Sequence, residues 1–126
     1  MKNSKTKINE DFVTSEAHQI EENDVDQTLN RTKSILKKLK NTKWKPFKED
    51  VLLLIEMLKA YQNKKYSAVP WKSISAITFT LLYIINPFDV VPDFIPFVGY
   101  VDDISVLGFC LNLVRSDIEA FKVWRN

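Results

Sequence analysis

The stretch between residues 86 and 103 constrains the fold most, because it separates two apolar segments and cannot form a continuous helix. It holds three of the chain's five prolines, one of its two glycines and four aspartates. Proline fixes φ, lacks a backbone donor and pushes the preceding residue out of the α region. The stretch is also rich in Phe, Val and Ile, which a solvated loop would not need. We therefore expect a stiff, partly extended connector that is buried or lies at an interface.

This connector and the residues just before it carry a motif that extends from Tyr83 to Asp103. The positions that define the motif are Tyr83, Pro87, Asp89, Pro92, Asp93, Pro96, Gly99, Asp102 and Asp103. The pattern resembles the signature of the YkvA-like family, the DUF1232 domain of unknown function, over residues 58–113. Asn86 stands where the family more often has Ser, and Val90-Val91 where Leu-Ile is commoner. The resemblance implies a small helical domain, often described as membrane-associated, with no established reaction.

Charge is distributed by region along the 126 residues, a length that suits one domain or one domain with a tail. The formal net charge of +2 divides into −4 over residues 1–30, +9 over 31–72, −4 over 73–114 and +1 over 115–126. The region 73–114 has no basic residue at all and is strongly apolar. The distribution of charge along the chain therefore says more about its organisation than the net charge of +2 does.

Hydrophobic periodicity predicts an all-α protein of about four helices, with no alternating pattern that would indicate a strand. The expected helices cover residues 24–40, 47–64, 71–85 and 103–124. The last two form an apolar helical hairpin joined by the Pro/Asp-rich connector. Residues 1–23 are polar, and we expect a disordered tail there, followed by a single helical domain over 24–126 with residues 58–113 as its DUF1232-like core.

The helix at 71–85 is apolar on every side, so it must be buried either in protein or in lipid. The 16 uncharged residues between Lys72 and Asp89 fall short of the roughly 20 that a spanning helix needs. Against this, a small chain has little mass to cover such a helix, and basic residues flank a hairpin whose connector holds only acids. One hypothesis is a membrane hairpin with transmembrane helices or a re-entrant loop and both termini in the cytoplasm. The alternative is a cytoplasmic protein that buries the hairpin in its own core.

The four aspartates of the connector permit two interpretations. Asp89, Asp93, Asp102 and Asp103 could hold Mg²⁺ or Ca²⁺, which take carboxylate oxygens. The favoured interpretation is that each accepts backbone N–H bonds, with Asp102 as a helix N-cap. Catalysis by a carboxylate pair is disfavoured, because the region offers no nucleophile and no oxyanion stabiliser.

The remaining chemically reactive residues are few. Cys110, the single cysteine, excludes an internal disulfide and a cysteine-based zinc site, and we expect it to be a small buried hydrophobe. His18, the single histidine, has no second ligand near it in the sequence, so a metal or catalytic role is disfavoured. Residues 1–10 are too polar to hold the apolar core of a cleavable signal peptide. The Lys-rich residues 31–48 lack the accompanying patterns of nucleic-acid binders.

The sequence therefore favours a non-enzymatic, membrane-associated helical protein with a structural or interaction role. One alternative is a soluble helical protein-binding module, and another is a divalent-cation-dependent protein that uses the aspartates. We expect membrane lipid as a partner and leave a protein partner open. We expect no cofactor, no nucleic acid and no small-molecule substrate.

Overall fold

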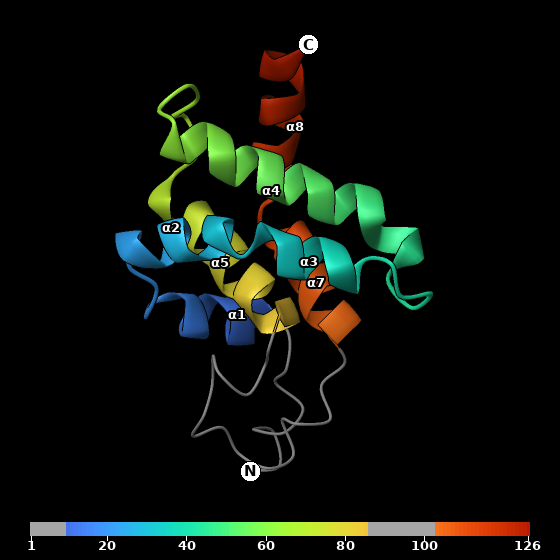
Figure 1. Cartoon of the computed structure of the whole chain (residues 1–126). Helices are drawn as coiled ribbons and strands as arrows, with labels where there is room; N and C mark the ends of the chain where they lie inside the picture. The colour runs from blue at the N-terminus through green and yellow to red at the C-terminus, as the bar shows by residue number, and fades with distance from the viewer. Residues whose placement is uncertain (1–9, 86–102) are drawn as a thin grey trace.

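The structure is a computed structural model that describes residues 10–85 and 103–126. Within these residues it contains seven α-helices, one 3-10 turn and no strand, which confirms the all-α class (Figure 1). The elements are α1 (Glu10–Ala17), α2 (Glu22–Asn30), α3 (Thr32–Lys38), η2 (Lys45–Phe47), α4 (Lys48–Gln62), α5 (Trp71–Ile85), α7 (Asp103–Leu113) and α8 (Arg115–Arg125). The predicted number of four helices is too small.

Part of the difference arises because two of the expected helices are each divided by one residue. Arg31, with φ −105° and ψ 20°, separates α2 from α3, and Val114, with φ −105° and ψ 17°, separates α7 from α8. At the first break the Thr32 hydroxyl donates to the Leu29 carbonyl at 2.6 Å. Such bonds from a side chain to the preceding turn compete with the helical ladder and bend helices. Neither break has the Pro or Gly that would have marked it in the sequence.

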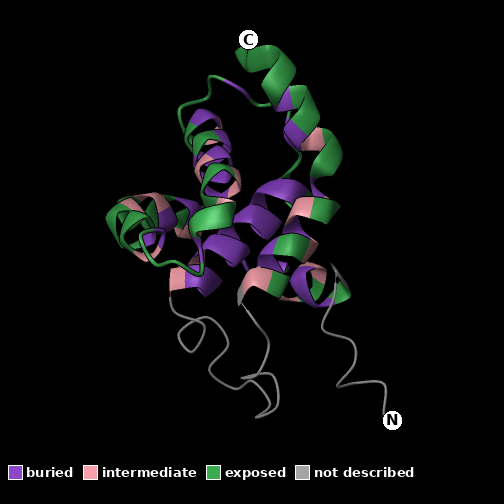
Figure 2. Cartoon of the chain, turned by 90° about the vertical axis from the view of Figure 1, so that its right-hand side faces the viewer, coloured by how far each residue is buried: buried purple, intermediate pink, exposed green. Residues whose placement is uncertain are grey.

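Helix α5 is the centre of the bundle. It contacts α1, α2, α3, α4 and α7, and all its residues from Ser73 to Leu81 are buried. Figure 1 shows this helix within the bundle, with the other helices around it, and Figure 2 marks the buried residues of the chain. A helix that is apolar on all sides can be buried in protein or in lipid, and in this structure α5 is buried in protein.

Helix α1 supplies part of that enclosure, and it lies where the sequence predicts a disordered tail. That expectation is wrong for this segment, because Phe12, Val13, Ala17 and Ile20 are all buried in the core. The Phe12 ring meets Phe79 of α5 edge-on, with 5.8 Å between ring centroids. The apolar residues are sparse, but their spacing places them on one face of the segment, and that face meets α5 and α7.

The end of α4 is closed by a C-terminal cap that uses a residue in the left-handed conformation. Lys64 has φ 61°, and its amide donates to the Tyr61 carbonyl at 3.1 Å. The following amide, of Lys65, donates to the Ala60 carbonyl at 3.0 Å. This pair of bonds is the Schellman motif, whose left-handed position is usually glycine because a Cβ is strained there.

Helix α8 packs on the rest of the protein through an aromatic cluster. Phe121 is buried, and the ring of Tyr66 lies 5.3 Å from that of Phe121 and 4.8 Å from that of Trp124. Arg125 also forms an exposed ion pair with Glu56 of α4 at 2.6 Å. The aromatic contacts hold α8, since an exposed ion pair contributes little.

The apolar hairpin is described only in part. Helices α5 and α7 contact each other, and the end of α5 and the start of α7 lie at the same end of the bundle (Figure 1). The residues between them lie outside the described ranges. Among the described residues, 10–85 and 103–126, no helix combines the length and apolar character that crossing a bilayer requires.

Candidate functional site

Most of the motif residues singled out in the sequence lie outside the described ranges. These are Pro87, Asp89, Pro92, Asp93, Pro96, Gly99 and Asp102. Tyr83 is described and buried, and its ring packs on Phe12 and Phe79 in the core. Asp103 begins α7. No group of three or more metal-ligating side chains occurs in the part of the chain that the structure describes. The cation and backbone-cap interpretations of the aspartates therefore stay predictions.

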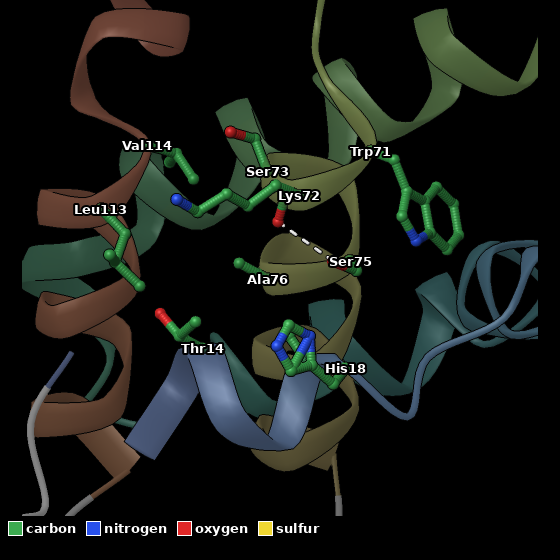
Figure 3. A pocket seen from close by; sticks show the side chains of 10 residues that line it. Thr14, His18, Trp71, Lys72, Ser73, Ser75, Ala76, Leu113 and Val114 are labelled. Atoms are coloured by element: carbon green, nitrogen blue, oxygen red, sulfur yellow. Dashed lines mark hydrogen bonds between the residues drawn. The ribbon is translucent and has the colours of Figure 1, made fainter. Parts of the chain in front are cut away.

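Two features of the described residues are candidates for a functional site, and the first is a cavity. It lies between α1, the start of α5 and the junction of α7 with α8, and its volume is about 270 Å³ (Figure 3). We call it the α1–α5 cavity. Its lining residues are Thr14, Ala17, His18, Trp71, Lys72, Ser73, Ser75, Ala76, Leu113 and Val114.

The polar groups of this cavity come from two helices that approach it from opposite sides. Figure 3 shows Lys72 extending across the space from α5, while Thr14 and His18 point into it from α1 and the turn that follows. Both Lys72 and His18 are exposed, so their polar ends are accessible to a solute. The cavity thus has an ammonium group on one side and an imidazole and a hydroxyl on the other.

The serine hydroxyls of the cavity donate to groups within the protein. Ser73 donates to the carboxylate of Asp117 on α8, and Ser75 donates to the Lys72 carbonyl at 3.0 Å. Ser73, Asp117 and His18 are the residue types of a hydrolytic triad, but such a triad needs serine bonded to histidine and histidine to aspartate. Here serine is bonded to aspartate directly. The three side chains therefore do not form that triad.

The sequence contained little signal for this cavity. His18 has no other His or Cys near it in the polar N-terminal sequence, and Ser73 and Asp117 are 44 positions apart. The spacing of Val13, Ala17 and Ile20 on one helical face was the available signal for α1, and with α1 in place His18 lies next to α5.

The second candidate is a surface of basic side chains that extends from the start of α3 through the following turn and η2 to the first residue of α4. Residues 31–48 contain eight basic residues and no acidic one. Seven of the eight are exposed and Lys38 is partly exposed, whereas Ile35, Leu39 and Trp44 of the same segment are buried. Leu36 is 40% exposed among the lysines. We call the exposed side of residues 31–48 the basic surface.

The ionisable groups with shifted pKa values lie outside both candidates. Tyr61 donates to a Glu22 oxygen at 2.6 Å, and this hydrogen bond, together with desolvation and the glutamate charge, raises the pKa of Tyr61 to about 12. Partial burial raises the pKa of Glu16. Burial also raises the pKa of Cys110 to about 12, and the thiol lies 3.7 Å from the Ala76 carbonyl oxygen. The expectation that Cys110 is a buried hydrophobe is confirmed.

The class of protein that these features define is a small all-α bundle with an enclosed central helix and a basic surface. A family model described as a protein of unknown function, DUF1232, matches residues 73–109. The uncharacterized membrane protein YkvA of Bacillus subtilis (strain 168) is 32% identical over 77 residues, which are 61% of this chain and 73% of the relative. No solved structure matches. The chain belongs to the YkvA-like family of DUF1232 proteins.

Proposed function

We propose that this protein is a non-enzymatic helical domain that attaches to anionic membranes through its basic surface. The observation that carries the proposal is the concentration of eight basic and no acidic residues in positions 31–48, seven of which are exposed between Arg31 and the first residue of α4. The name of its relative, an uncharacterized membrane protein, supports a membrane role. Because α5 is enclosed by protein, we assign lipid contact to the basic surface and not to that helix.

The expected affinity follows from charge and from one apolar side chain. Each Lys or Arg close to an anionic leaflet contributes about 1 kcal/mol, so four of the eight in contact would supply about 4 kcal/mol. Burying the exposed part of Leu36 would add about 1 kcal/mol. The total of about 5 kcal/mol corresponds to a reversible attachment with a dissociation constant somewhat below 1 mM. Combining charge with an inserted apolar group is how many peripheral proteins bind membranes.

The orientation of the attached protein follows from the location of anionic lipid. The cytoplasmic leaflet carries the negative surface potential, so we propose that the helical body lies on the cytoplasmic side. This orientation agrees with the predicted cytoplasmic position of both termini, and it does not require that α5 or α7 enter the bilayer.

The test is binding to vesicles of phosphatidylcholine alone and to vesicles that also contain phosphatidylglycerol, measured by flotation at low and high salt. We expect binding only to the anionic vesicles and its loss at high salt, since screening weakens exposed charges. Replacing Lys33, Lys37 and Lys40 by Gln should weaken binding about 100-fold, at about 1 kcal/mol per residue.

The matched control replaces Lys59, Lys64 and Lys65 by Gln, which changes the net charge equally at α4 and its end. We expect that control to retain most of the binding. Equal losses in the two triple variants, or equal binding to neutral vesicles, would overturn the proposal. Tighter binding to a DNA duplex than to anionic vesicles would assign the basic surface to nucleic acid instead.

A further inference from the structure

The lining of the α1–α5 cavity favours a negatively charged ligand. Lys72 and His18 are its ionisable lining residues, and no acidic residue lines it. They line the cavity from opposite sides, so both can add to the attraction of an anion within it (Figure 3). Asp117 is bonded to Ser73 and is not a lining residue. The N-terminal end of the 15-residue α5 also faces this region, and the positive end of its dipole adds to the attraction.

The rest of the lining favours a ligand that also has an apolar part. Ala17, Ala76 and Val114 are buried there, and Leu113 is partly buried. The small side chains of Ala17 and Ala76 leave room in the cavity for a ligand. A volume of about 270 Å³ is just below the range of about 300–1,000 Å³ of ligand pockets, so it suits a ligand with only a few carbon atoms beyond its anionic group.

We infer that the α1–α5 cavity is a binding site for a small organic anion, a carboxylate or phosphate that carries a short apolar or hydroxylated group. Lys72 supplies the charge-assisted hydrogen bond, and Thr14 and His18 supply donors on the opposite side. This site is separate from the basic surface and does not depend on membrane attachment.

The test uses the fact that His18 is the only histidine, so its ring signals in an NMR spectrum need no assignment. The full-length protein is titrated at constant pH and ionic strength with hexanoate, inorganic phosphate, glycerol 1-phosphate and, as a neutral control, hexanol. We expect a saturable shift of the His18 signals at millimolar concentration with at least one of the anions and none with hexanol. A preference for hexanoate identifies a carboxylate ligand, and a preference for glycerol 1-phosphate over phosphate identifies a headgroup-like ligand.

Two variants decide whether the cavity causes the shift. Lys72→Gln removes one exposed charge and should weaken binding about tenfold, the usual consequence of losing a charge-assisted hydrogen bond. Lys59→Gln makes the same change on the exposed side of α4 and should bind as the natural protein does. No saturable shift with any anion, an equal response to hexanol, or unchanged affinity in Lys72→Gln would overturn the inference.

Discussion

Replacing Phe12 tests whether α1 belongs to the folded body. This side chain is 8% exposed, and its ring lies edge-on to Phe79 at 5.8 Å and to Tyr83 at 6.2 Å. Phe12→Ala removes a buried aromatic ring and leaves a cavity beside α5, which typically costs about 3–5 kcal/mol. Phe12→Leu keeps most of the buried area and loses the aromatic contacts, for a cost of about 0.5–1.5 kcal/mol. The cost of either variant is limited by the free energy at which α1 detaches by itself.

Urea unfolding followed by circular dichroism measures these costs. With a urea dependence of about 1–3 kcal/mol per molar, Phe12→Ala should lower the midpoint by about 1 M or more. The control is Ser15→Ala, at an exposed position of the same helix, which should leave the midpoint nearly unchanged. If Phe12→Ala and Ser15→Ala behaved alike, α1 would not be packed on α5, and the disordered tail predicted from the sequence would be correct.

Three further predictions concern single positions. Lys64→Gly should stabilise the protein by up to about 1 kcal/mol by removing the left-handed strain, and a melting temperature no higher than that of the natural protein would contradict this. Burial raises the pKa of the Cys110 thiol from 9.0 to about 12. The protonated thiol therefore contributes its full share to the free energy of unfolding below pH 9, and this share is lost as the pH rises from 9 towards 12. At pH 10 the natural protein should therefore have lost stability, on the order of 1 kcal/mol, that Cys110→Ala does not lose, and parallel pH profiles in urea unfolding would refute the assignment. For Asp89 and Asp102, Asn variants should melt like the natural protein and Ala variants should lose about 1 kcal/mol each, with or without Mg²⁺ or Ca²⁺. A cation-dependent rise in melting temperature that the Asn variants lack would show a metal site instead.

The parts of the fold that local sequence determines were predictable. The expected helix over residues 71–85 coincides with α5, because Pro70 precedes it and no residue interrupts its apolar run. The expected helix over 47–64 agrees with α4 to within two residues at its end. All-α class followed from the same periodicity.

What the sequence did not predict depends on contacts between distant segments. Helix α1 has a composition typical of a tail, and it is ordered by partners in α5 and α7 that local periodicity cannot supply. Likewise, the breaks at Arg31 and Val114 have no local marker. The α1–α5 cavity is lined by three segments that are far apart in the sequence, namely α1, the start of α5 and the junction of α7 with α8. Neither composition nor a motif indicates that these segments meet.

The packing of α1 has a consequence for the order in which the protein is made. Residues of α1 are synthesised before the helices that cover them, which end at Ile85 and Leu113. Because synthesis proceeds at about 5–20 residues per second, roughly 5–20 s pass between the synthesis of α1 and the completion of α7. Helix α1 therefore cannot be packed in its final place until α5 and α7 have been synthesised. Phe12, whose ring contacts lie in α5, stays uncovered until that helix is synthesised, and the few apolar residues of this polar segment limit what it can bind in that interval.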